Sequence, residues 1–239
     1  MLEVLHRDTN LAVLNKPAGI SLLADRSGAS CLWDALPEAL QAKPFLVHRL
    51  DKGTSGVLLI ALNQATQSRL TRMFQRHEVR KYYIAWVQGQ LASGRTRVID
   101  LPLRKGRKSR YRVAGERAAI TETQHGWRLA PGSEQREGHP SRTRLRVLAS
   151  PAGRCLVALN PCTGRTHQLR VHLAWIGHPI LGDHLYGRPG APDQQASRLL
   201  LHCHRLVVPG FGSFSARVPD GAPPSDPSRS LPRWHPDAW

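Results

Sequence analysis

The stretch His48-Arg49-Leu50-Asp51-Lys52-Gly53-Thr54-Ser55-Gly56 runs directly into the apolar segment Val57-Leu58-Leu59-Ile60-Ala61-Leu62. The first part is polar and rich in turn-forming residues, whereas the second is a continuous apolar run, so we expect a loop followed by a buried strand. Asn63 is a good N-cap, and apolar residues recur at helical spacing over 64–77, which predicts a helix there. Asp51 therefore lies in a polar loop that leads into a strand and a helix.

Working outward from this stretch, the chain contains more predicted strands than helices. Further helices are expected over 30–40, capped by Ser30, and over 166–176, where Gly177 and Pro179 supply a stop signal. Strands are expected over 11–14, 45–48, 57–62, 82–87, 120–129, 142–148, 155–159 and 199–208. This order predicts an α+β fold built on a mixed, largely antiparallel sheet with flanking helices.

The charge of the chain is strongly basic. Lysine and arginine number 34 against 17 acidic residues, which gives a formal net charge of +17 and a pI near 11.1. A surplus of this size indicates a polyanionic partner, most simply a nucleic acid. Most of the basic residues are arginine, a composition that fits either codon bias in a GC-rich genome or bidentate phosphate binding.

Several classes of protein and site are disfavoured by the sequence. No apolar run approaches the length of a transmembrane helix, and the N-terminus lacks the pattern of a signal peptide, so we expect a cytoplasmic protein without a membrane partner. The four cysteines are scattered without a C-x-x-C pair, and no H-E-x-x-H motif occurs. Reduced thiols and no metal site are therefore expected.

Three segments concentrate residue types that can carry chemistry: residues 48–56, Lys81-x-Tyr83-x-Ala85, and Gly164-Arg165-Thr166-His167-Gln168-Leu169-Arg170-Val171-His172. Singly, each has an ordinary structural explanation as a turn, a core aromatic residue or a helix start. In this order, with Asn15-Lys16-Pro17-x-Gly19 before them and Arg198-Leu199-x-Leu201-His202 after them, they resemble the RluA-type family of RNA pseudouridine synthases. Cys203 stands where alanine is usual in that family.

The resemblance implies an isomerase that converts uridine to pseudouridine in tRNA, in ribosomal RNA or in both. The N1–C1′ bond breaks, the uracil turns, and C5 joins C1′, with neither cofactor nor metal. The catalytic aspartate maps onto Asp51, which would act as a nucleophile at C1′ or as a base at C2′, two routes that the sequence leaves open. Tyr83 would stack on the uracil, and Arg165 would pair with Asp51 and keep its carboxylate charged.

The resemblance also suggests residues that bind the substrate. The target base must leave its stack, and Arg49 is the candidate to fill the vacated space. Leu201 would form an apolar wall behind the uracil, and Lys16 would be structural or contact a phosphate. The basic run 104–112 is either a solvated loop or an RNA contact, with Arg107, Lys108 and Arg110 as its leading residues. Three motif histidines are expected to be hydrogen-bonded scaffold: His48, His167 and His172.

The expected organisation is a catalytic domain over residues 1–218, in two lobes with a central active-site cleft, and a Pro-rich tail over 219–239. We expect no S4-type RNA-binding domain before the first motif, and we expect a monomer. Two other functions stay open. A glycosidase or nuclease acting on RNA would need a second carboxylate, for which Asp183 is the candidate. A non-catalytic RNA-binding module with the same fold is the other.

Overall fold

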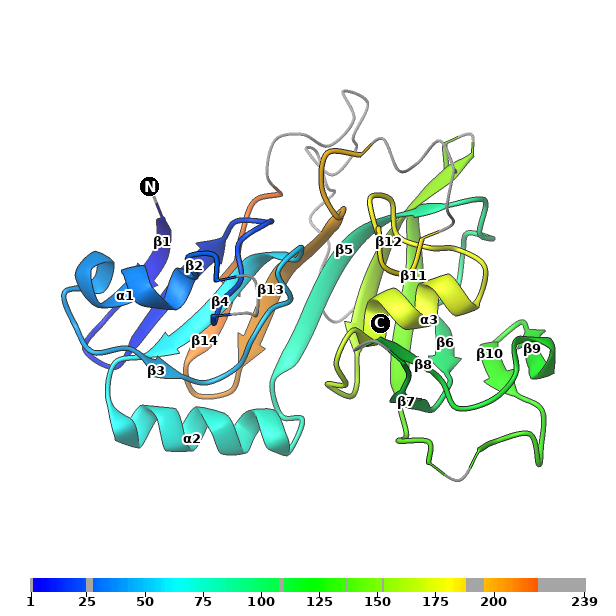
Figure 1. Ribbon diagram of the computed structural model, residues 1–239, viewed down its shortest axis with the longest axis horizontal. Helices are drawn as coiled ribbons and strands as arrows, with labels where there is room; N and C mark the ends of the chain where they lie inside the picture. Colours follow the sequence, from blue (N-terminus) through cyan, green and yellow to red (C-terminus); the bar gives the residue numbers. More distant parts are fainter. Residues whose placement is uncertain are drawn as a thin grey trace. The chain divides into compact units, whose positions relative to one another are not determined.

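The computed structural model describes residues 2–24, 28–107, 110–135, 137–151, 153–187 and 196–218. These residues form two compact units (Figure 1). The first unit comprises residues 2–83 and 201–218, and the second comprises residues 84–200. Strand β5 (Arg80–Gln88) begins in the first unit and continues in the second. The predicted tail over 219–239 lies outside the described residues.

The first unit is built on a sheet whose central strand is the apolar run identified in the sequence. Every residue of β4 (Ser55–Ala61) is buried. The strand order is β1 (Glu3–Arg7), β2 (Leu11–Lys16), β4 and β13 (Leu201–Val208). In addition, β3 (Phe45–Leu46) pairs with β4, and β14 (Gly212–Ser215) pairs with β13. β2 runs antiparallel to β4 and β13 runs parallel to it. Because β4 has strands on both sides and is covered on both faces, its sequence is apolar throughout.

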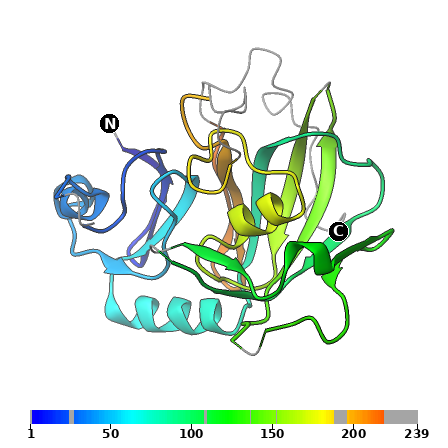
Figure 2. The same ribbon diagram turned by 45° about the vertical axis from the view of Figure 1, so that its right-hand side comes forward.

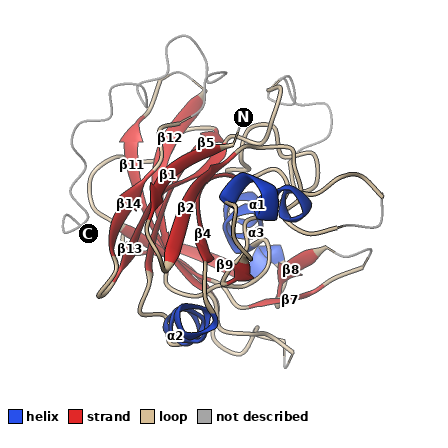
Figure 3. Cartoon of the chain, turned by 90° about the vertical axis from the view of Figure 1, so that its left-hand side faces the viewer, coloured by secondary structure: helices blue, strands red, loops and turns tan. Residues whose placement is uncertain are grey.

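Two helices complete the first unit. Helix α2 (Gln64–Gln75) begins as predicted, because the Asn63 side chain accepts a hydrogen bond of 2.9 Å from the Thr66 amide. The cap predicted for the other helix is wrong: α1 (Leu32–Leu40) begins after Cys31, without a side-chain cap, and not after Ser30. Helix α2 contacts β3 and β4. Figure 3 shows it end-on, below β4.

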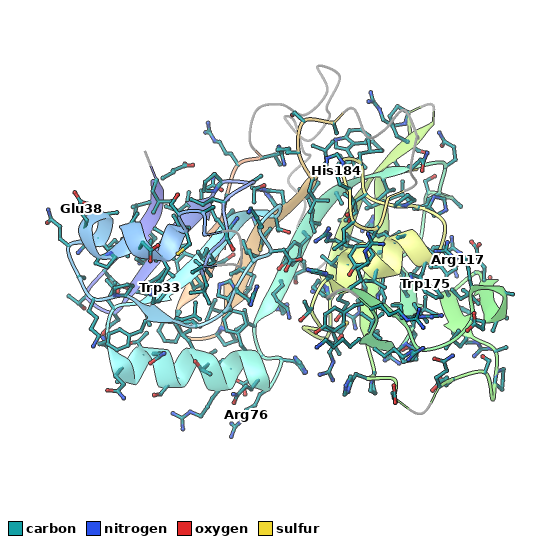
Figure 4. All side chains as sticks on the ribbon, viewed as in Figure 1. Trp33, Glu38, Arg76, Arg117, Trp175 and His184 are labelled. Carbon is teal, nitrogen blue, oxygen red and sulfur yellow. The ribbon has the colours of Figure 1, made fainter. Side chains whose placement is uncertain are left out.

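The strands of the second unit pair in a mixed, largely antiparallel order, and the unit also contains a short hairpin (Figure 2). The strand order is β5, β12 (Arg154–Pro161), β11 (Arg142–Ala149), β6 (Arg97–Asp100), β10 (Gly126–Leu129) and β9 (Ile120–Thr123). Strands β7 (Leu103–Lys105) and β8 (Tyr111–Val113) form the hairpin. Helix α3 (Gln168–Trp175) and the 3-10 turn η1 (Arg117–Ala119) lie beside them. Figure 4 shows Arg117 beside Trp175, with its guanidinium 5.1 Å from the ring centroid.

The mixed, largely antiparallel sheet predicted from the sequence is confirmed, with parallel pairing at β4–β13 and β6–β10. The single strand predicted over 120–129 is wrong, because the chain reverses there between β9 and β10. Gly126 begins β10 with a φ of 137°, and a Cβ there would lie 1.9 Å from the Val98 carbonyl oxygen, so glycine is needed for the close pairing of β10 with β6. No helix in the described part of the chain has both the length and the apolar character needed to span a membrane.

Candidate active site

The Asp51 loop is held by hydrogen bonds of its own backbone and by the segment that follows β2. The Thr54 amide donates to the Asp51 carbonyl over 3.0 Å, and the Gly19 amide donates to the Lys52 carbonyl over 2.9 Å. Asp51 itself is half-buried, directly before the buried start of β4. The loop therefore has a fixed backbone while its carboxylate keeps some access to solvent.

Lys16, at the end of β2, also holds the Asp51 loop through hydrogen bonds to backbone carbonyls. Its side chain is fully buried, and Nζ donates to the carbonyls of Pro17, Lys52 and Thr54 over 2.8, 3.3 and 3.0 Å. Burial lowers the pKa of Lys16 to about 8, and the negative charge of Asp51 opposes this shift. Of the two roles expected for Lys16, this geometry fits the structural one, with an electrostatic contribution beside Asp51.

Tyr83 on β5 shares this environment. Burial raises the pKa of its hydroxyl well above the usual value, and a hydrogen bond with Cys203 and the charge of Asp51 act in the same direction. Burial also raises the pKa of the Cys203 thiol to about 12. Tyr82 is buried, and it points to the opposite side of the strand from Tyr83 because side chains alternate. The structure therefore brings Lys16, Asp51, Tyr83 and Cys203 together in the first unit.

Gly56 allows β13 to approach β4 at this site. Its φ is 112°, and a Cβ at this position would lie 2.2 Å from the Cys203 carbonyl oxygen. Only glycine has no such atom, so the backbones can pair with His202 opposite Ser55 and Cys203 opposite Gly56. The last glycine of the 48–56 motif is thus required by the placement of Cys203 next to Tyr83.

Leu201 lies on the same face of β13 as Cys203, two residues away, and is buried. The apolar wall expected of it is compatible with this position and stays a prediction. One residue on, His202 is also buried, and its Nδ1 lies 2.9 Å from the Ser55 hydroxyl. This pair joins the last motif of the chain to the strand that follows the Asp51 loop.

His48 acts as a structural hydrogen-bond acceptor. Its Nε2 accepts from the Leu59 amide over 2.9 Å, and its ring stacks on Phe74 at a centroid distance of 4.5 Å. Burial lowers the pKa of His48 to about 3, and the charge of Lys81 adds to this effect. The ring is therefore neutral at physiological pH, which agrees with the scaffold role predicted for it.

In the second unit, Gln168 organises the loop that carries Arg165. The Gln168 side chain is buried, and its Oε1 accepts from the Arg165 amide over 3.1 Å and from the Thr163 hydroxyl over 2.7 Å. Its Nε2 donates to the Arg142 carbonyl over 3.0 Å. The Arg165 side chain is exposed. Gln168 is a positioning residue that the sequence analysis did not single out. Its place in the motif 164–172 was the available signal, and its burial is visible only in the structure. The predicted pairing of Arg165 with Asp51 stays a prediction.

The other motif histidines are bonded within the second unit. His172 is fully buried, with Nε2 2.9 Å from the Leu101 carbonyl and Nδ1 3.0 Å from the Thr143 hydroxyl, and burial lowers its pKa to about 4. His167 Nδ1 lies 2.8 Å from the Tyr186 hydroxyl. Both contacts agree with the predicted scaffold role.

Asp183 is the carboxylate that a glycosidase would need, and the structure gives it another role. Arg170 binds it in a bidentate pair, with Nε to Oδ2 at 2.8 Å and Nη2 to Oδ1 at 2.7 Å. Its Oδ1 also accepts from the amides of Leu185 and Tyr186, and the residue is buried. A carboxylate occupied in this way shapes the loop after α3 and is not available as a second catalytic acid.

The predicted RNA-contact residues are placed as follows. Arg49 is exposed in the Asp51 loop. Arg107 and Arg110 are exposed in the turn between β7 and β8, so the basic run is a hairpin tip with strands on both sides and not a long loop. Lys108 lies outside the described residues. In the part of the chain that the structure describes, no group of three or more histidine, cysteine or acidic residues could hold a metal ion.

Comparison with known proteins extends these observations. A family model described as RNA pseudouridylate synthase matches residues 10–175. The dual-specificity RNA pseudouridine synthase RluA of Yersinia pestis is 37% identical over 218 residues, which cover 88% of this chain and 94% of that protein. The tRNA pseudouridine synthase C of Salmonella typhi is 36% identical over 227 residues, covering 87% and 80%. The solved structure of human RNA Pseudouridylate Synthase Domain Containing 4 is similar with a TM-score of 0.73 at 27% identity, covering 91% and 88%.

Proposed function

Because the chain belongs to the RNA pseudouridylate synthase family and isomerises uridine to pseudouridine in RNA, we propose that Asp51, Tyr83 and Arg165 are its catalytic residues. The observation that carries this assignment is the electrostatic contact of Asp51 with both Lys16 and Tyr83 in the first unit. A carboxylate on a loop with a fixed backbone, near an aromatic ring that can stack on a base, is suited to act on a bound nucleoside, because positioning of the reacting groups lowers the barrier.

The reaction balances without an external electron donor or acceptor. The N1–C1′ bond breaks and a C5–C1′ bond forms, while C5 loses a proton and N1 gains one. Asp51 supplies the group that acts at the sugar, either as a nucleophile at C1′ or as a base at C2′. Both routes need the ionised carboxylate, and Lys16 and Arg165 are the cations that favour this form.

Tyr83 is suited to hold the uracil by stacking. Its raised pKa keeps the hydroxyl protonated at physiological pH, so the ring presents an apolar face and a hydrogen-bond donor. As a phenol it is a weak base, and any part it takes in removing the C5 proton requires a partner that accepts the proton. Leu201, on the Cys203 face of β13, provides the apolar wall behind the base in this proposal.

Substrate binding in the proposal follows from exposure and charge. Arg49, two residues from Asp51 and exposed, enters the space that the target base leaves. Arg107, Arg110 and their neighbour Lys108 contact phosphates from the β7–β8 hairpin. We assign these roles to a catalytic domain over residues 1–218 that acts as a monomer in the cytoplasm.

A tRNA or a ribosomal stem-loop is the proposed substrate. One relative is named a tRNA pseudouridine synthase and another a dual-specificity RNA pseudouridine synthase, which supports this class of RNA. The target nucleotide is easier to extrude from a loop than from a helix, because fewer stacking and pairing contacts are lost.

The test is to map pseudouridine at single-nucleotide resolution in tRNA and ribosomal RNA from cells that lack this gene. The strain is complemented with wild type, with Asp51→Asn or with Asp183→Asn as the matched carboxylate control. We expect the missing sites to return with wild type and with Asp183→Asn to the extent that this variant folds, but not with folded Asp51→Asn. Restoration by Asp51→Asn would overturn the assignment of Asp51, and release of free uracil in vitro would favour a glycosidase.

A further inference from the structure

A groove in the first unit lies outside the site described above. It has a volume of about 390 Å³ and lies between helix α2 and the turn that joins β13 to β14. Its lining residues come from these two elements and the segment after α2: Arg69, Arg72, Met73, Arg76, Glu78, Pro209 and Gly210. This volume is in the range of sites that hold small ligands or single chemical groups.

The arginines of the groove share one face of α2. Arg69, Arg72 and Arg76 are spaced three and four residues apart, which places them side by side along the helix, and all three are exposed. One glutamate, Glu78, faces them, with its Oε1 4.0 Å from Arg76 Nη1, so the groove keeps a surplus of positive charge. Figure 4 shows Arg76 extending outward from the end of α2.

One arginine of this positive surface is held in place by an aromatic ring, and the helix dipole favours all of the cations near the end of α2. The Arg69 guanidinium lies 4.6 Å from the centroid of the Phe211 ring, so it is held by a cation–π contact. The last turn of α2, which contains Arg72, carries the negative end of the helix dipole, and this end stabilises cations and not anions. An anion in the groove must therefore be bound by the arginine side chains themselves, and guanidinium groups bind phosphate in a bidentate manner.

The groove is connected to the Tyr83 site by two strands of the same unit. Glu78 lies five residues before Tyr83, and Pro209 lies six residues after Cys203. At about 3.3 Å per residue, both paths limit the separation to roughly 16–20 Å at most, a distance that a few nucleotides span. An RNA strand that places its uridine against Tyr83 can therefore reach the groove with its flanking backbone.

We propose that Arg72 and Arg76, with Arg69 held on Phe211, form a second RNA-contact site that binds the sugar–phosphate backbone a few nucleotides from the target uridine. This inference rests on the proposed function for the choice of RNA as the ligand. The site supplies affinity and register and takes no part in bond breaking, because phosphate contacts position a nucleic acid without reading its sequence.

The test compares two doubly substituted proteins with the same loss of charge. Arg72→Gln/Arg76→Gln alters the groove, and Arg7→Gln/Arg128→Gln removes two exposed arginines from β1 and β10. Arg69 is left in place because its contact with Phe211 contributes to packing. Unmodified tRNA from cells lacking the gene is the probe, and affinity is measured at several salt concentrations. Unchanged melting temperatures establish that both proteins are folded.

We expect the groove variant to show a slope of log affinity against log salt that is shallower by about 1.4, since each lost phosphate contact on a single strand contributes about 0.7. Its KM should rise with little change in kcat. Equal affinity and slope in the two variants would overturn the inference. So would a loss of polyglutamate binding without a loss of RNA binding, which would make the groove a site for an acidic protein. Binding is measured separately from isomerisation, so absence of pseudouridine formation by wild type would contradict only the proposed function.

Discussion

The Lys16 ammonium group donates a 3.0 Å hydrogen bond to the Thr54 carbonyl, and this contact connects the end of β2 to the end of the Asp51 loop. With its bonds to Pro17 and Lys52, a single buried side chain satisfies three backbone acceptors. A buried lysine is normally unfavourable, and these bonds together with the charge of Asp51 offset only part of its desolvation.

Replacing Lys16 by methionine should therefore reduce both stability and activity. The substitution keeps the apolar stem but leaves the buried Thr54 carbonyl without this donor, which costs about 1–3 kcal/mol for an unsatisfied group. We expect a lower free energy of unfolding in urea and a lower kcat, because the Asp51 loop loses its support. Wild-type activity in the variant would show that the loop is held by its backbone bonds alone.

The same residue gives a stability difference that depends on pH. The pKa of Lys16 is about 8 in the folded protein and 10.5 in an unperturbed lysine, so the unfolded state binds more protons between these values. The stability of wild type relative to Lys16→Met should then rise from pH 8 to pH 10.5, by up to about 3 kcal/mol. Parallel urea titrations of the two proteins across this range measure it, and a constant difference would contradict the assignment.

Gly56 and Gly19 provide a matched pair for testing the approach of β13 to β4. Both have positive φ angles, 112° and 87°, but a Cβ on Gly56 would lie 2.2 Å from the Cys203 carbonyl, whereas nothing lies within 4 Å at Gly19. Gly19→Ala should cost about 1 kcal/mol through backbone strain alone. Gly56→Ala should lower the free energy of unfolding several times more and abolish activity. Urea unfolding measures the first, and release of tritium from RNA labelled at C5 of uridine measures the second. Similar losses in the two variants would show that β13 can move away without consequence.

The fold could be predicted best where apolar runs are long. The segment Val57–Leu62 and the Asn63 cap are read directly from the sequence, because complete burial and a local hydrogen bond determine them. The strands that the sequence did not predict are mostly short or exposed, such as β1 and β14. Their pairing depends on distant partners, which no local pattern contains.

The candidate site divides in a similar way. The motifs identify Asp51, Tyr83 and Arg165, but they carry no information on support by residues distant in sequence. The pairing of Cys203 with Tyr83 joins residues 120 positions apart, and the bonds of Lys16 to the Asp51 loop join residues up to 38 positions apart. Such contacts follow from the register of β13 and β2 on β4 and become visible only in the folded chain.

Two histidines with lowered pKa values, the half-buried His48 and the buried His172, should make the protein sensitive to acid. The pKa values of His48 and His172 are lowered to about 3 and about 4, while an unperturbed histidine titrates near 6.5. Below pH 6.5 the unfolded chain takes up protons that the folded chain does not. The free energy of unfolding therefore decreases as the pH is lowered, by about 1.4 kcal/mol per pH unit for each histidine near pH 5. His172→Gln should remove one such contribution from the slope of stability against pH. Equal slopes in His172→Gln and wild type would contradict a neutral buried His172.

The cysteines differ in accessibility to solvent, so alkylation of their thiols can test the packing around Tyr83. Cys31, Cys155 and Cys203 are buried, and Cys162 is half-buried. Since the thiolate is the reactive form, burial and a pKa of about 12 should protect Cys203 from alkylation. We expect N-ethylmaleimide to label Cys162 first in the native protein at neutral pH, and Cys203 only when the first unit opens.

Tyr83→Ala should expose Cys203, because it removes the hydrogen-bond partner of the thiol together with its aromatic ring. Tyr83→Phe keeps the ring and should leave Cys203 protected, which separates the effect of packing from that of the hydroxyl. Peptide mass spectrometry after timed labelling measures each site, with Cys155 in the second unit as the internal control for global unfolding. Rapid labelling of Cys203 in the wild type, with Cys155 still protected, would mean that the Tyr83 ring does not seal the face of β13 on which the uracil is proposed to rest.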